Sequence, residues 1–199
     1  MLLGVFRTKE RRIIAAIIGL TIIIISIWII TSYKHNREFV EQAAMAENYL
    51  KAGSYEEAIQ AYLKALSMKD GDEQLLTIGL AEAYAGADEY DSALEALRSY
   101  YKKNPENRVK EKIEEITSEK ADYDFNQSIS LAEVYFSNQE YEKAIAEFEK
   151  AKLIKSREAL SYQRIAEAYI ELGDYNRAKE EVTEGLEITQ DKSLEQTME

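Results

Sequence analysis

The chain has 199 residues, a formal net charge of −12 and no cysteine. The lack of cysteine excludes disulfides, thiol nucleophiles and cysteine metal ligands. One proline and eight glycines are few, and such a composition favours a mostly helical protein. Beyond the first 30 residues the chain has 21 basic and 36 acidic residues. Such an acidic region should be repelled by nucleic acid and by anionic lipid headgroups, so we expect protein or peptide partners, among them basic segments.

The segment from Ile13 to Tyr33 contains no charged residue. As an α-helix at ~1.5 Å per residue it would span about 31 Å, close to the thickness of a bilayer's hydrocarbon core. A cleaved signal peptide has a shorter apolar run, and a buried core helix would have a polar face. We therefore predict a single-pass transmembrane helix over residues 13–33, with the lipid bilayer as its surroundings.

Basic residues flank the predicted span unequally. Four precede it, within a predicted tail over residues 1–12, whereas only Lys34 and Arg37 follow closely. The positive-inside tendency then places the tail in the cytoplasm and the rest of the chain outside the cell membrane. Residues 34–38 are expected to form a juxtamembrane spacer, in which the single histidine, His35, is solvated.

Four segments after residue 38 share one pattern of alanine and tyrosine. In each segment an alanine is followed three residues later by a tyrosine, six residues later by a second tyrosine, and three residues after that by another alanine. The four copies are Ala46-Tyr49-Tyr55-Ala58, Ala81-Tyr84-Tyr90-Ala93, Ala132-Tyr135-Tyr141-Ala144 and Ala166-Tyr169-Tyr175-Ala178.

This pattern resembles the tetratricopeptide repeat (TPR) family, whose period is about 34 residues. Gly53 and Gly173 match the turn glycine of that family, whereas Asp88 and Gln139 replace it in the middle copies. The resemblance implies an all-α solenoid of about four helix-turn-helix repeats, two over residues 39–107 and two over residues 125–192. We interpret the alanine and tyrosine columns as packing positions between helices, with no catalytic role.

The second and third copies are 17 residues further apart than one period, which leaves room for an extra helix. We expect a connecting helix over residues 108–124, with Val109, Ile113 and Ile116 as a thin apolar stripe. Residues 193–199 are expected to form a short tail rather than a capping helix. Truncation of a longer protein, self-association and a sufficiently polar last helix are the three explanations, and we favour the last.

The resemblance implies that the first helix of each repeat lines a concave groove. Groove positions then include Ala43, Ile78, Ile129 and Gln163, and a column of glutamates: Glu47, Glu82, Glu133 and Glu167. Leu50, Phe136 and Ile170 would offer apolar pockets beside them. An acidic groove would attract basic peptide segments. The alternative is that glutamate recurs as a soluble helix former.

No motif for catalysis, metal binding or a cofactor appears, so we expect a non-enzymatic protein. The main hypothesis is an adaptor or chaperone-like interaction module anchored in a membrane, as in bacterial cell envelopes. The alternatives are a structural spacer or self-assembling scaffold, which would make the chain a homo-oligomer, and an organelle-membrane receptor with repeats facing the cytosol.

Overall fold

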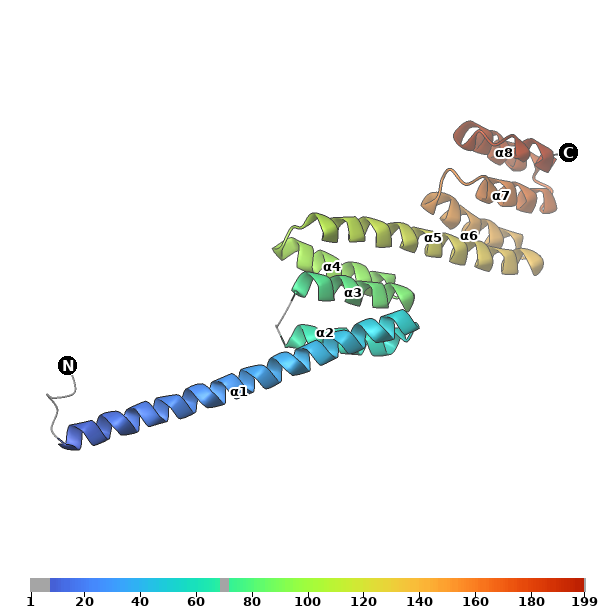
Figure 1. Ribbon diagram of the computed structural model, residues 1–199. Helices are drawn as coiled ribbons and strands as arrows, with labels where there is room; N and C mark the ends of the chain where they lie inside the picture. Colours follow the sequence, from blue (N-terminus) through green and yellow to red (C-terminus); the bar gives the residue numbers. More distant parts are fainter. Residues whose placement is uncertain (1–7, 69–71, 199) are drawn as a thin grey trace. The chain divides into compact units, whose positions relative to one another are not determined.

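The computed structural model describes residues 8–68 and 72–198, and within these ranges it is helical with no strand (Figure 1). The all-α prediction is confirmed. Residues 1–7 of the predicted basic tail lie outside the described residues. The helices are α1 (Thr8–Ala52), α2 (Tyr55–Ser67), α3 (Glu73–Gly86), α4 (Tyr90–Lys103), α5 (Asn107–Ser137), α6 (Tyr141–Ile154), α7 (Ala159–Glu171), α8 (Tyr175–Thr189) and the 3-10 helix η1 (Lys192–Met198).

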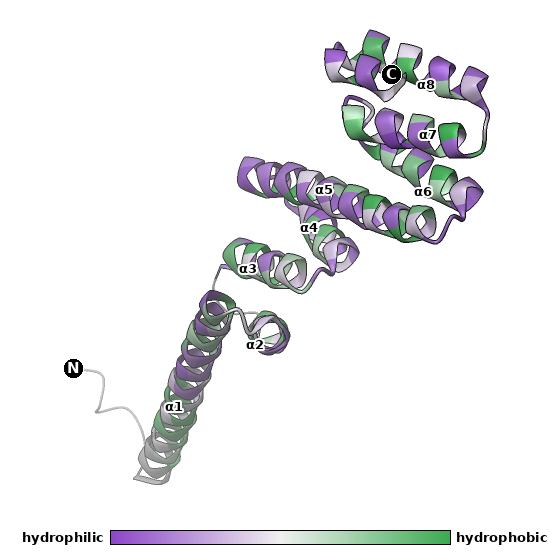
Figure 2. Cartoon of the chain, turned by 90° about the vertical axis from the view of Figure 1, so that its right-hand side faces the viewer, coloured by the Kyte–Doolittle hydropathy of each residue, from purple (hydrophilic) through white to green (hydrophobic). Residues whose placement is uncertain are grey.

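Helix α1 is one uninterrupted helix of 45 residues. It contains the apolar segment, the expected spacer and the first helix of the first repeat. Residues 34–38 are therefore helical rather than a break, because no proline or glycine interrupts them. The large apolar side chains from Ile17 to Ile30 are exposed, and Figure 2 shows this stretch as a mostly hydrophobic rod. By length and composition α1 could serve as a membrane span or as a signal sequence.

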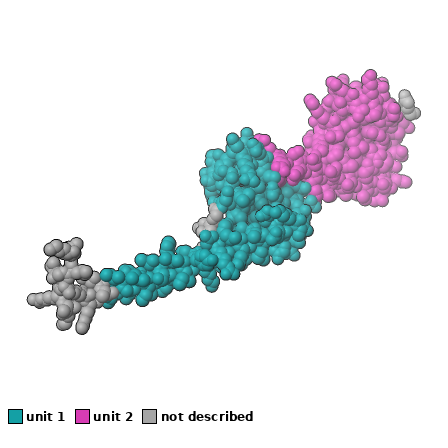
Figure 3. All heavy atoms as spheres, in the orientation of Figure 1, with its two compact units in different colours: residues 1–113 teal, residues 114–199 magenta. Residues whose placement is uncertain are grey.

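The chain divides into two compact units, residues 1–113 and 114–199, which Figure 3 colours separately. In the first unit, the end of α1 packs with α2 and α3 around Ala46, Ala58, Tyr62 and Leu80. Gly79 allows a close approach of α3 to α2, because a Cβ added there would lie 2.4 Å from Cζ of Tyr62.

Helix α5 includes both the expected connecting helix and the first helix of the third repeat. We expected a separate connecting helix over residues 108–124, but α5 runs without interruption from Asn107 to Ser137. Its extra turns continue directly into the first helix of the third repeat. Val109 and Ile116 of the expected thin stripe are buried. This part of α5 therefore packs as a structural helix instead of a solvated connection.

The second unit ends in a segment that covers the last repeat. We expected a tail over residues 193–199, but Lys192–Met198 form η1, which packs against α7 and α8. Leu194 of η1 is fully buried in one cluster with Tyr162, Ala178 and Val182. Gly185 on α8 makes room for it, because a Cβ there would meet Leu194 at 2.8 Å. Part of the surface of α8 is therefore covered by η1, whereas we had expected the polar residues of α8 to be sufficient without a cap.

The four turns between paired helices share one backbone conformation. Gly53, Asp88, Gln139 and Gly173 all have positive φ, between 62° and 76°. Each lies just after a first helix, where a left-handed residue closes the helix by bonding the following amide back to it. Asp88 and Gln139 therefore adopt the conformation that glycine adopts in the other two repeats.

Candidate binding surface

The structure places the eight alanines of the repeat pattern in fully buried positions. In each repeat they lie where the first and second helices cross, so a larger side chain would force the helices apart. The eight are Ala46, Ala58, Ala81, Ala93, Ala132, Ala144, Ala166 and Ala178.

The tyrosines of the pattern lie closer to the surface. Tyr49, Tyr84, Tyr135 and Tyr169 of the first helices are half-buried. Tyr55, Tyr90, Tyr141 and Tyr175 each begin a second helix, and of these only Tyr175 is exposed. The Tyr141 hydroxyl donates to Glu171 at 3.3 Å, and the Tyr141 ring meets Phe136 edge-on at 5.3 Å between centroids. The tyrosines therefore have an apolar body in the packing and a hydroxyl near water.

In the first unit, both glutamates of the predicted column are paired with lysines of the same chain. Glu47 on α1 lies 2.5 Å from Lys51, one turn later. Glu82 on α3 lies 2.9 Å from the ammonium of Lys112 on α5. The two carboxylates also help raise the pKa of Tyr62, for which burial of the hydroxyl is the main cause. The acidic character expected of this surface is thus partly neutralised.

In the second unit, one arginine joins the other two glutamates. Arg164 on α7 donates through Nε to Glu133 on α5 at 2.6 Å and through its terminal nitrogens to Glu133 and Glu167. Its guanidinium lies 5.0 Å from the ring centroid of Phe136. Burial lowers the pKa of Arg164, but the hydrogen bonds to both glutamates outweigh it and raise the pKa overall. The cluster carries one net negative charge.

The apolar neighbours of the glutamates are only partly accessible. Leu50, Phe136 and Ile170 are half-buried and pack against the cores of their units. Of the other groove positions, Ala43 and Ile129 are half-buried, and Gln163 donates to Glu167 at 2.8 Å. Ile78 is buried in the core and is therefore closed to a ligand. The expected apolar pockets are thus shallow.

Exposed apolar residues that the sequence-based prediction did not include lie on the helix faces that carry the glutamates. Val40, Leu75 and Leu160 lie seven residues before Glu47, Glu82 and Glu167, and they are 57%, 51% and 41% exposed. Residues at i, i+3 and i+7 share a helix face, so this column extends each groove position by two turns. Asn126 occupies the equivalent place in the third repeat. The signal available in the sequence was an aliphatic residue at one repeat position in three of four copies.

A second ion cluster ties the second helices of the last two repeats together. Lys152 on α6 contacts Glu149 and Glu181 at 3.0 Å each and lies 5.3 Å from the Tyr162 ring centroid. Burial lowers the pKa of Lys152, but hydrogen bonds to Glu181 and Glu149 raise it overall. Burial raises the pKa of Glu181, although Lys152 opposes this. This cluster joins α6 to α8.

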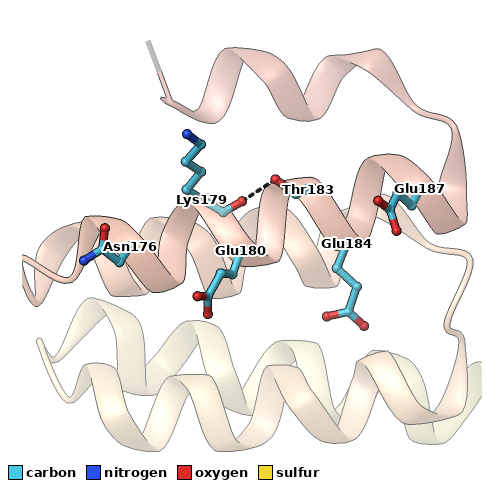
Figure 4. Close-up of a pocket in the computed structure, with 6 residues that line it drawn as sticks. All are labelled: Asn176, Lys179, Glu180, Thr183, Glu184 and Glu187. Carbon is cyan, nitrogen blue, oxygen red and sulfur yellow. Dashed lines mark hydrogen bonds between the residues drawn. The ribbon is translucent and has the colours of Figure 1, made fainter.

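A shallow hollow follows the outer side of α8, lined by residues of that helix alone (Figure 4). In the close-up, Lys179 points away from Glu180 and Glu184, so these polar groups do not converge on one point. Among the residues that the structure describes, no group of three His, Asp or Glu side chains is placed to hold a metal ion.

Paired helices that repeat with buried small residues and left-handed turns define an α-solenoid, the class of helical repeat protein that binds other proteins. Family models of the tetratricopeptide repeat match residues 43–116, and residues 128–157 and 159–192. The matches cover more than half of the chain, which therefore belongs to the tetratricopeptide repeat family. Its fold is that of a protein–protein interaction module, and members of this family generally act as scaffolds rather than enzymes.

Several solved structures resemble the fold. A crystal structure of MamA protein is 20% identical, covers 78% of this chain and 93% of its own, and has a TM-score of 0.36. MamA from Desulfovibrio magneticus RS-1 is 17% identical, with coverages of 77% and 96% and a TM-score of 0.38. At such identities and scores nothing beyond the repeat fold transfers to this chain. A search of curated proteins finds no significant match.

Proposed function

We propose that this chain is a membrane-anchored TPR interaction module. Residues 13–33 would span the bilayer, with the tail over residues 1–12 in the cytoplasm and the repeats on the other side. The observation that supports the anchor is the exposed aliphatic surface of α1, which would be costly in water. The same helix continues into the first repeat, so the span and the first helix of that repeat are parts of one helix.

We infer that the first-helix face binds an apolar segment of another protein with neutral or basic flanks. In the first unit, the exposed Val40 and Leu75 support the apolar contact. Leu160 occupies the same repeat position in the second unit. In the second unit, the cluster of Arg164, Glu133 and Glu167 keeps one net negative charge. It would repel an acidic segment and accept a basic one at the edge of the contact.

Site-specific photocrosslinking in intact membranes tests the groove. A crosslinker at Glu47, on the same face of the first unit, should capture a discrete partner, and Val40→Ser with Leu75→Ser should reduce that yield at least several-fold. Leu63→Ser is the matched control, because Leu63 is also an exposed leucine, on the second helix α2. Equal losses from the control and the groove variants would contradict the proposed surface.

The anchor is tested separately. The chain should stay with membranes after alkaline extraction, and Ile23→Arg with Ile24→Arg should release it, because each arginine at the centre of a span costs about 3 kcal/mol on the insertion scale. A reporter fused after Glu199 that folds only in the cytoplasm should be inactive. An active reporter would reverse the orientation and favour the receptor alternative with cytosolic repeats.

A further inference from the structure

The first unit has two opposite edges along the direction of α1. The C-terminal ends of α2 and α4 and the N-terminal ends of α3 and α5 lie at one edge, on the side of the apolar part of α1 (Figure 1). The opposite edge carries the turns at Gly53 and Asp88. We call these the proximal edge and the distal edge.

At the proximal edge, side-chain contacts join α2 to α1 and join the link between α4 and α5 to α3. Lys64, near the end of α2, lies 3.8 Å from Glu38 of α1. Glu106, in the link from α4 to α5, accepts hydrogen bonds from Tyr100 at 2.8 Å and from Gln74 at the start of α3. The link that follows α4 therefore lies beside the first turn of α3.

The proximal edge is basic although the chain is strongly acidic. Residues 102–108, at the link from α4 to α5, contain three basic residues and one acidic residue. The three basic residues, Lys102, Lys103 and Arg108, are exposed, and no ion pair joins any of them to another described residue. The distal edge is acidic, because residues 84–92 around the Asp88 turn contain three acidic residues and no basic one.

Acidic residues of the proximal edge are already engaged within the protein. Asp72 caps α3 by accepting from the backbone amide of Leu75 at 3.1 Å. Glu106 accepts the two hydrogen bonds described above, and Glu38 pairs with Lys64. Glu73, in the first turn of α3, and Glu111, near the start of α5, are further exposed acids of this edge.

The continuous helix α1 sets the height of each edge above the proposed membrane. Glu38, and with it Lys64, lies five residues beyond Tyr33, or about 8 Å at ~1.5 Å per residue. Ala52, at the distal edge, lies 19 residues beyond Tyr33, or about 29 Å. The Debye length at physiological ionic strength is about 8 Å, so charge on the membrane acts on the proximal edge and scarcely on the distal one.

We propose that Lys102, Lys103 and Arg108 form a lipid-contacting edge that binds anionic headgroups of the membrane in which α1 is anchored. The inference rests on the anchor proposed above. It replaces the expectation of uniform repulsion from anionic lipid with an orientation in which the basic edge meets the headgroups and the acidic edge points away. Each basic residue at an anionic surface favours the contact about fivefold.

The test uses the full chain reconstituted in vesicles, labelled through one introduced cysteine, since the chain has none of its own. A fluorophore at Asn104→Cys reports the proximal edge and one at Ala52→Cys the distal edge. The vesicles carry a headgroup quencher and contain phosphatidylcholine alone or mixed with phosphatidylglycerol. Quenching at Asn104→Cys should be at least about twofold stronger in the mixed vesicles and should fall in high salt, whereas Ala52→Cys should change little.

Replacing Lys102, Lys103 and Arg108 by Gln should abolish the effect of phosphatidylglycerol. The control replaces Lys150, Arg177 and Lys179 by Gln, which changes the net charge equally on the second unit and should leave the effect intact. Quenching that is insensitive to lipid charge, or equally sensitive in both triple variants, would overturn the proposal. Failure of the chain to float with either kind of vesicle would instead contradict the anchor.

Discussion

Arg164 on α7 donates hydrogen bonds to both carboxylate oxygens of Glu133 on α5, and so joins the first helices of two successive repeats across the binding face. The same guanidinium contacts Glu167 one turn along α7. Two glutamates that looked like ligand-binding groups in the sequence are therefore also part of the protein's own scaffold.

Arg164→Met should destabilise the second unit by about 1–3 kcal/mol, because two partly buried carboxylates lose their partner. Urea unfolding monitored by circular dichroism measures the change. Arg177→Met is the matched control: Arg177 also pairs with an acid and lies over an aromatic ring, but it is exposed, so its loss should cost less than about 1 kcal/mol. Equal costs would mean that Arg164 does not bridge the helices.

Gln139→Gly should raise stability by about 0.5–1 kcal/mol, because Gln139 has a φ of 62° and glycine adopts that conformation without strain. Asp88→Gly should gain less, since aspartate tolerates the left-handed region better than glutamine. Asn138→Gly, one residue earlier and outside that region, should give no gain. Thermal unfolding of the three variants separates backbone strain from a general effect of glycine.

Leu194→Ala should destabilise the second unit by about 2–4 kcal/mol, as expected for a fully buried leucine that leaves a cavity. Hydrogen exchange should rise in α7 and α8 and stay unchanged in α2 and α3, which belong to the other unit. Leu153→Ala is the control, because Leu153 is an exposed leucine of the same unit. Unchanged protection of α8 would show that η1 is not a cap.

Glu181→Gln should become progressively more stable relative to the wild type as pH rises from about 4.5 through the raised pKa of Glu181. Burial raises the pKa of Glu181 in the folded state, so protonation stabilises the wild-type fold at low pH, and that contribution is lost as pH rises. Urea titrations at several pH values give the difference between the two proteins. A difference that is constant with pH, or that falls as pH rises, would contradict the raised pKa.

The repeat architecture could be predicted because its signal is redundant, with four copies of one alanine and tyrosine pattern. The continuity of α1 and α5 was missed for a different reason. We inferred boundaries at residues 34–38 and 124 from a change of composition and from the repeat period, yet neither place contains a proline or glycine that would end a helix. A helix continues through polar residues unless something stops it.

The binding face was harder to predict than the fold. The glutamate column is visible in the sequence. Its partners are not, because Lys112 lies 30 residues after Glu82 and Arg164 lies 31 residues after Glu133. No local sequence pattern indicates pairs so far apart. Burial of Leu194 depends on the space left by Gly185, which becomes apparent only once α8 and η1 are folded together.

Because α1 is uninterrupted, no flexible linker separates the proposed anchor from the first repeat. One residue inserted after Tyr33 would rotate the repeats of the first unit by about 100° about the axis of α1. Seven inserted residues make nearly two full turns and would leave their direction almost unchanged. The basic edge faces the headgroups after either insertion, but seven residues lift it by about 10 Å, beyond the Debye length, and should weaken its contact with anionic lipid. The direction in which the binding face of the first repeat points, about the axis of α1, is therefore fixed by the number of residues between the span and that repeat.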